Sequence, residues 1–180
     1  MSIPEGLALQ RDVITPEKET EIIAWLDVHP WSTELARRTQ HYGYGYDYRR
    51  KNLTPGPALE GPILEVAQII ERAGLMHPVQ CIVNEYTRSQ GITAHIDNTN
   101  FGPVVIGLSI SGDGVMVFQR GAERVECFLP RRSIVMLSGP ARYEWTHSIE
   151  KKVTYIDDHG IKITKPQDYR RVSLTYRELA

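Results

Sequence analysis

The chain has 180 residues, of which 41% are hydrophobic and 24% are charged, and its formal net charge is -1. These values are typical of a single soluble globular domain and exclude a disordered or fibrous chain. The near-neutral charge also excludes a global electrostatic field that attracts nucleic acid, so any binding of that kind depends on a local patch.

Cysteine usage and hydropathy indicate in which cellular compartment the protein is expected. Cys81 and Cys127 lie in apolar runs, which argues against a disulfide framework and favours a reducing environment. The first residues lack a basic stretch followed by an apolar core, and no apolar run approaches the ~20 residues that span a bilayer. We therefore expect a cytoplasmic protein, or a nuclear one in a eukaryote, that is not secreted, contacts no membrane and acts as a monomer.

The chain begins with a predicted strand over 7–14 and a predicted helix after it. Thr15 is a suitable N-cap for this helix, and Pro16 suits its first position. Ile22 and Leu26 form an apolar stripe at helical spacing, and Pro30 follows the expected end.

A second amphipathic helix is predicted over 57–73, with Gly74 as the residue that stops it. Its expected inner face consists of Leu59, Ile63, Leu64, Ala67, Ile69 and Ile70. We expect both helices to pack against one sheet and to carry no chemistry.

Residues 37–51 combine alternating tyrosines with basic pairs at both ends. In a strand, the four tyrosines would share one face. Rings that stack on a base, beside cations that neutralise phosphates, are what nucleic-acid binding requires. The candidate substrate contacts are Tyr42, Tyr44, Tyr46, Arg49 and Arg50. The alternative is a tyrosine-rich strand that packs on the sheet beside a basic loop.

A central strand is predicted over 79–86. Asn84 and Tyr86 share one of its faces, and each offers a neutral hydrogen-bond partner to a carboxylate. The alternative is that the two side chains close the turn that follows the strand.

The segment 91–97, GITAHID, contains a candidate pair of metal ligands. His95 and Asp97 are two positions apart, so in a strand both side chains point the same way. With a second histidine from elsewhere they would form the facial triad of non-haem Fe(II) oxygenases. A short HxD pair alone has many false positives.

Four further strands are predicted over 104–110, 114–119, 124–129 and 133–138, and Gly112–Gly114 is predicted to be a hairpin turn between the first two. Many short strands at this spacing are typical of an antiparallel sandwich or jelly roll. We therefore predict a mainly β fold with flanking helices: a double-stranded β-helix, or jelly roll, with the two N-terminal helices packed on its major sheet.

His147 is the preferred third ligand, because it continues an apolar run into a predicted strand. Arg142, shortly before it, is expected near the mouth of the site. His159 is the alternative ligand, but it lies in a DDHG turn, where a histidine usually faces water.

The C-terminal stretch RVSLTYR is a predicted strand that places Arg171, Ser173, Thr175 and Arg177 on one face. Arginine is almost never fully buried unless it is paired. Two guanidiniums with two hydroxyls between them suit a small dicarboxylate such as 2-oxoglutarate, because guanidinium binds carboxylate through paired hydrogen bonds. The alternative is an exposed strand face with ordinary surface charges.

The order and spacing of NEY at 84–86, HID at 95–97, WTHSI at 145–149 and RVSLTYR at 171–177 resemble the AlkB family of Fe(II)/2-oxoglutarate dioxygenases. The resemblance covers roughly 81–177. It implies a jelly roll and, as the commonest activity, oxidative demethylation of nucleic acid. We accordingly expect one dioxygenase domain over 1–180, with its core over 79–177 and a substrate lid over 37–51.

The resemblance also implies ligands and partners. Fe(II) would be held by His95, Asp97 and His147. The 2-oxoglutarate contacts would be Arg171 at the distal carboxylate and Arg177 near the metal, assisted by Asn84, Tyr86, Ser173 and Thr175. Dioxygen and single-stranded DNA or RNA complete the expected partners.

Two departures from the family pattern bear on the substrate. Ser173 replaces the asparagine that the family has in its last strand, so a hydroxyl stands where an amide contacts 2-oxoglutarate. Thr99 stands where founding members have a second aspartate that contacts the methylated base. The alternatives are a 2-oxoglutarate-dependent hydroxylase of a protein side chain or small molecule, and a non-catalytic jelly-roll binding module.

Overall fold

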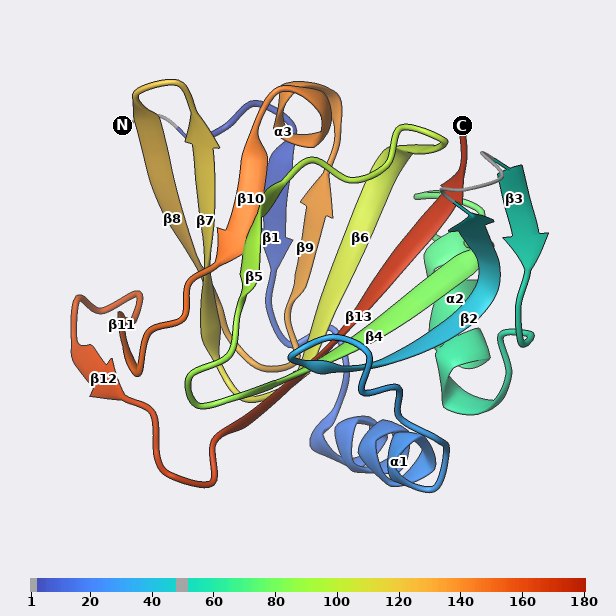
Figure 1. Cartoon of the computed structure of the whole chain (residues 1–180), viewed down its shortest axis with the longest axis horizontal. Helices are drawn as coiled ribbons and strands as arrows, with labels where there is room; N and C mark the ends of the chain where they lie inside the picture. Colours follow the sequence, from blue (N-terminus) through green and yellow to red (C-terminus); the bar gives the residue numbers. More distant parts are fainter. Residues whose placement is uncertain (1–2, 48–51) are drawn as a thin grey trace.

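The computed structural model describes residues 3–47 and 52–180, and it is built from antiparallel sheets with helices outside (Figure 1). In the described residues the larger sheet has seven strands, in the order β1 (Leu7–Gln10), β9 (Ile134–Leu137), β6 (Phe101–Ser111), β13 (Arg170–Leu179), β4 (Gln80–Thr87), β2 (Arg38–Asp47) and β3 (Asn52–Pro55). The smaller sheet has the order β5 (Ile92–His95), β10 (Thr146–Ile149), β7 (Gly114–Arg120) and β8 (Glu123–Leu129).

The two sheets face each other, which is the jelly-roll arrangement expected from the sequence. A separate hairpin, β11 (Thr154–Ile156) with β12 (Lys162–Thr164), projects beside the smaller sheet (Figure 1). Among the described helices, none is long and apolar enough to cross a membrane.

Helix α1 (Pro16–Asp27) confirms the predicted start. The Thr15 side chain accepts a hydrogen bond from the Lys18 amide at 3.2 Å, which satisfies one free donor of the first turn. Ile22 and Leu26 are completely buried against the larger sheet.

Helix α2 (Gly61–Arg72) begins four residues later than the predicted 57–73. Pro62 is the physical reason, because a proline suits the first turn of a helix and disfavours helical backbone in the residue before it. The predicted inner face is also partly wrong, since Leu64 and Ile69 are 37% and 53% exposed. The buried stripe is Pro62, Ile63, Val66, Ala67 and Ile70.

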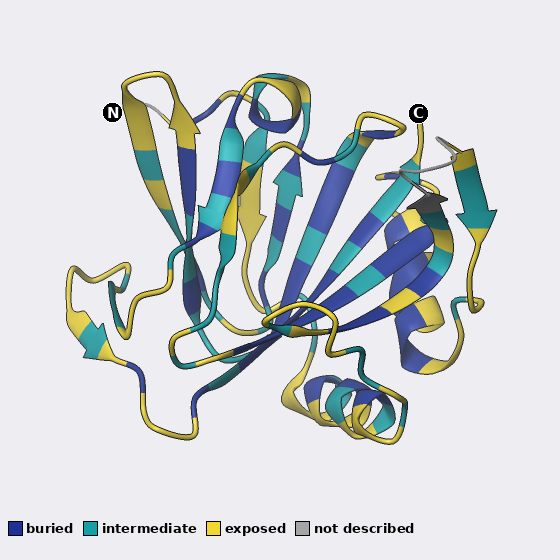
Figure 2. Cartoon of the chain, viewed as in Figure 1, coloured by how far each residue is buried: buried dark blue, intermediate teal, exposed yellow. Residues whose placement is uncertain are grey.

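Both helices cover the outer face of the larger sheet, and their apolar stripes join β4, β6 and β13 in one core (Figure 2). A second core lies between the sheets and consists of Val105, Phe118, Leu129, Val135, Leu137 and Trp145. The larger sheet is therefore packed on both faces, and its inner face is free to line a site only where polar side chains replace this core.

The predicted hairpin at Gly112–Gly114 is wrong. Strands β6 and β13 pair with each other, and β9 pairs with the opposite edge of β6, so no edge of β6 is left for β7. The glycine turn instead carries the chain from the larger sheet to the smaller one, and Gly112 adopts a φ of 69° there.

The tyrosine segment forms β2, but its tyrosines do not form one ligand-facing row. Tyr42 is 6% exposed in the core beneath the helices, and its hydroxyl donates to the Gln40 side chain at 3.0 Å. Tyr44 is exposed, and Gly43, with a φ of 77°, interrupts the strand between them. The expectation that Tyr42 contacts substrate is therefore wrong, because its ring is buried in the core against the helices.

This arrangement predicts opposite outcomes for two neighbouring tyrosines. Tyr42→Ala should lower the free energy of unfolding by about 3 kcal/mol, because it leaves a large cavity in the core. Tyr44→Ala is the matched control and should change it by less than about 0.5 kcal/mol. Urea unfolding of both variants measures the difference, and an unchanged stability of Tyr42→Ala would contradict the core assignment.

Candidate active site

A pocket of about 540 Å³ opens between the two sheets, and we call it the central pocket. Its walls come from β4, β6 and β13 of the larger sheet and from β5, β7 and β10 of the smaller one. The central pocket contains every residue predicted to bind metal or 2-oxoglutarate: Asn84, Tyr86, His95, Asp97, His147, Arg171, Ser173, Thr175 and Arg177.

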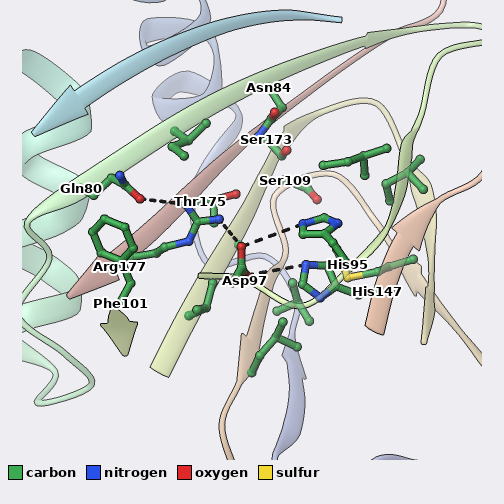
Figure 3. Close-up of a pocket in the computed structure, with 18 of the residues that line it drawn as sticks. Gln80, Asn84, His95, Asp97, Phe101, Ser109, His147, Ser173, Thr175 and Arg177 are labelled. Atoms are coloured by element: carbon green, nitrogen blue, oxygen red, sulfur yellow. Dashed lines mark hydrogen bonds and ion pairs between the residues drawn. The ribbon is translucent and has the colours of Figure 1, made fainter. Parts of the chain in front are cut away.

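The two candidate histidine ligands are brought together by strand pairing. His147 on β10 lies directly opposite His95 on β5, and the centroids of the two rings are 4.4 Å apart. Strand β5 ends at His95, so Asp97 comes from the extended segment after it rather than from the strand itself. Its Oδ2 is 3.6 Å from His147 Nε2, and its Oδ1 is 4.0 Å from His95 Nε2 (Figure 3).

The three side chains offer ligand atoms that all lie within 4.8 Å of one another. Two imidazole nitrogens and one carboxylate oxygen are the donor set of the Fe(II) facial triad, so these residues fit that metal. His159, the alternative ligand, lies in the exposed turn between β11 and β12, and its imidazole Nε2 is 3.8 Å from the Asp158 carboxylate.

The surroundings of Asp97 and His147 favour the protonation states in which these side chains bind a metal. Burial raises the pKa of the Asp97 carboxyl, but Arg177 and then His147 lower it more, so the net pKa lies below its usual value. Burial lowers the pKa of His147 to about 4. At neutral pH the site therefore holds a carboxylate and a neutral imidazole, the forms that bind a divalent cation.

The segment that follows Asp97 is held by a buried arginine. Arg142 on α3 (Gly139–Tyr143) is 2% exposed and donates to the backbone oxygens of Asp97, Asn98 and Phe101, at 3.0, 2.9 and 2.6 Å. The expectation that Arg142 reaches the mouth is wrong, because the three carbonyls hold its guanidinium behind the ligand segment. This clamp fixes the backbone from which the Asp97 side chain projects.

Arg177 fixes the same carboxylate from the other side. One of its terminal nitrogens donates to Asp97 Oδ1, and the other donates to Gln80 Oε1 at 2.7 Å (Figure 3). Because Arg177 occupies Oδ1, the geometry leaves Oδ2, on the His147 side, available for a metal.

Arg171 lies at the opposite end of the same strand face and has no ion-pair partner among the described residues. It is 3% exposed, donates to Ser109 Oγ at 2.9 Å and lies over the Tyr86 ring. Its Nε is buried without a hydrogen-bond partner in the described chain. A buried guanidinium with an unused donor is expected to be costly unless an anion binds beside it.

Five polar residues of the pocket were not among the predicted metal, co-substrate or substrate contacts: Arg37 and His41, within the predicted lid, and Gln80, Asn98 and Ser109. Gln80 and Ser109 share strand faces with Asn84 and with other pocket residues, so the period of two could have indicated both. Arg37, whose Nε donates to Asn84 Oδ1 at 2.8 Å, precedes its strand, and no local pattern places it.

Most of the residues predicted to contact the substrate are not found among the residues that line the central pocket. Tyr44 does not line it, and Thr99 lies in an exposed turn, where its neighbour Asn98 lines the pocket instead. Arg49 and Arg50 lie outside the described residues, as does the side chain of Tyr46.

Comparison with known proteins identifies the family. Residues 17–177 match the model of the 2OG-Fe(II) oxygenase superfamily. The chain belongs to this superfamily. It is 28% identical over 99% of its length to "tRNA (carboxymethyluridine(34)-5-O)-methyltransferase alkbh8" of Xenopus tropicalis and 32% identical over 99% to "Alkylated DNA repair protein ALKBH8 homolog" of Arabidopsis thaliana. These relatives confirm the resemblance to the AlkB family.

The match to this oxygenase family extends to the fold. The chain superposes on "The structure of OsALKBH1" with a TM-score of 0.72 and 14% identity, covering 99% of this chain and 100% of that one. It spans 32% of the length of the Xenopus relative and 59% of the Arabidopsis relative, so both of those proteins contain further segments.

The triad of this oxygenase can be tested by metal binding. His95→Ala, Asp97→Ala and His147→Ala should each weaken Co(II) binding by at least about tenfold, because a ligand is lost from an open site. His159→Ala should bind Co(II) as the wild type does. Optical titration with Co(II) measures this, and normal binding by His147→Ala together with loss in His159→Ala would make the third ligand His159.

Proposed function

We propose that residues 1–180 act as one Fe(II)/2-oxoglutarate-dependent dioxygenase that oxidises a C–H bond of a nucleic-acid base. One observation carries the chemistry: a two-His, one-carboxylate cluster shares one pocket with Arg171, a buried arginine that pairs with no described carboxylate. A cytoplasmic location and a monomeric state remain predictions from the sequence.

We infer the following roles. His95, Asp97 and His147 would hold Fe(II), which supplies dioxygen activation coupled to conversion of 2-oxoglutarate into succinate and carbon dioxide. Arg177 keeps Asp97 ionised and correctly turned, and Arg142 holds its backbone. These residues would therefore keep the ligand set rigid through the reaction.

The 2-oxoglutarate contacts extend along one face of β13 and β4. Arg171 would bind the distal carboxylate with the donor that has no other partner, and Ser109 orients its guanidinium. The remaining proposed contacts are Asn84, Tyr86, Ser173 and Thr175, with Arg177 at the metal end. Because the Oδ1 of Asn84 accepts from Arg37, its amide donors are left for a carboxylate.

Nucleic acid as the substrate rests on the pocket entrance and on the relatives. One relative is named for tRNA and another for alkylated DNA. Strand β2 borders the pocket through Gly45, and the sequence between β2 and β3 includes Arg49, Arg50 and Lys51. Arg38 does not join this basic group, because it pairs with Glu85 and lies over Trp31.

Arg171 gives a prediction for the co-substrate. Arg171→Ala should weaken 2-oxoglutarate binding by at least about 30-fold, as expected when one partner of a buried charge pair is lost. Arg171→Lys should recover only part, because an ammonium lacks the planar fork. Arg170→Ala is the matched control, since Arg170 points away and pairs with Asp27 and Glu85.

Calorimetric titration of these variants with 2-oxoglutarate, with Mn(II) in place of iron, measures the affinities. Equal affinity in wild type and Arg171→Ala would refute the proposed anchor. Weakening in Arg170→Ala as large as in Arg171→Ala would indicate a general change of the strand instead.

Oligonucleotide binding tests the substrate class. Replacing Arg49 and Arg50 together by alanine should weaken binding of single-stranded oligonucleotides and flatten its dependence on salt, because fewer phosphates are neutralised. A control with Lys151 and Lys162 both changed to alanine removes two exposed charges that do not line the central pocket. Titrations at two salt concentrations decide the question.

The expected result is salt-sensitive binding that only the Arg49/Arg50 variant loses. Absence of salt-sensitive binding by the wild type, with 2-oxoglutarate consumption intact, would indicate a protein or small-molecule substrate instead.

A further inference from the structure

The charged groups that line the central pocket are strongly unbalanced. Among the side chains that the structure describes, Arg37, Arg171 and Arg177 line it, and Asp97 is the only carboxylate that does. Asp97 is already paired with Arg177 and belongs to the proposed metal site. The described lining therefore offers no second carboxylate that could pair with a positively charged substrate group.

Loading the site does not remove this imbalance. The charges of Fe(II) and of the 2-oxoglutarate dianion cancel, and Arg177 offsets Asp97. Arg171 would pair with the distal carboxylate, so the described charges of the loaded pocket still leave a net positive charge of two, and Arg37 has no anion of its own among them. A third buried cation, Arg142, lies directly behind the segment that carries Asp97.

The entrance of the central pocket also has more positive than negative charge. The pKa of His41, at the rim, is lowered by removal from water and then by Arg177 and Arg37. Glu34, which acts on His41 in the opposite sense, is exposed and does not line the pocket. The segment after Asp97 contributes Asn98, a neutral pocket residue whose Oδ1 accepts from the Asn100 backbone amide at 2.9 Å.

We propose that the central pocket selects bases whose oxidised group is uncharged or anionic and rejects cationic methylated bases. The proposal rests on the proposed function, because it assumes a base in the loaded pocket. A net positive lining at low dielectric repels a cation, and the described side chains of the lining include no carboxylate besides Asp97. The aliphatic lining, which includes Ile92, Ile96 and Met116, suits a neutral substituent instead.

A matched pair of oligonucleotides tests this selection. 3-Methyluracil and 3-methylcytosine carry the methyl group at the same ring position and have nearly the same shape, but at neutral pH only the second is a cation. Binding of each to protein loaded with Mn(II) and 2-oxoglutarate isolates the charge from turnover. We expect the 3-methyluracil strand to bind about tenfold or more tightly, as expected for unscreened repulsion near two charges.

Two variants tie the selection to the pocket. Asn98→Asp adds a carboxylate with almost no change of shape and should narrow or reverse the preference. Arg37→Gln should narrow it as well. Arg72→Gln is the control, because Arg72 is an exposed residue of α2 that does not line the pocket, and the preference should not change.

The outcomes separate the two proposals. Tighter binding of the 3-methylcytosine strand by the wild type, or equal binding of both strands, would overturn the charge selection and leave the dioxygenase function standing. Failure of both strands to bind, with 2-oxoglutarate consumption intact, would overturn nucleic acid as the substrate and the charge selection with it. A preference that Arg72→Gln changes as much as Arg37→Gln would also overturn it.

Discussion

The rest of the site depends on a single buried carboxylate. Asp97 is 5% exposed, a position in which an isolated charge would become protonated or disrupt the fold. It stays ionised because Arg177 binds one oxygen, two imidazoles face it, and Arg142 holds its backbone from behind. Each of these groups comes from a different element, so the sheets must close before the site exists. The metal site is in this sense a product of the tertiary fold rather than of the HxD motif.

Strand β13 organises the co-substrate end in the same way. It lies between β4 and β6, so its pocket-facing residues are framed by Asn84 on one side and Ser109 on the other. Its opposite face contributes Val172, Leu174 and Tyr176, which are completely buried under the helices. The apolar face therefore fixes the register that places Arg171 and Arg177 at the two ends of one pocket-facing row.

The features that the sequence predicts correctly are those that depend on residues close together in the chain. The period of two placed Arg171, Thr175 and Arg177 on one face, and the caps placed α1, because neighbours along the chain decide both. The other features depend on contacts between residues that are far apart in the sequence. No local pattern shows that Gly112–Gly114 joins two sheets, that Tyr42 packs under the helices or that Arg142 binds three carbonyls, because each depends on residues far away in the sequence.

The residues proposed for the chemistry and those that would contact the substrate lie on different parts of the fold. The proposed chemistry is carried by β4 and β13, whose outer faces pack in the helix-covered core, and by the paired strands β5 and β10. The residues that would meet the substrate lie elsewhere: Arg37 before β2, Gly45 in the hairpin and Asn98 in the turn after the ligands. Substitution there changes the charge and shape of the entrance without altering a strand register. The same frame can therefore serve different substrates, and in the proposed selection the charge around Asn98 and Arg37, rather than the triad, would distinguish them.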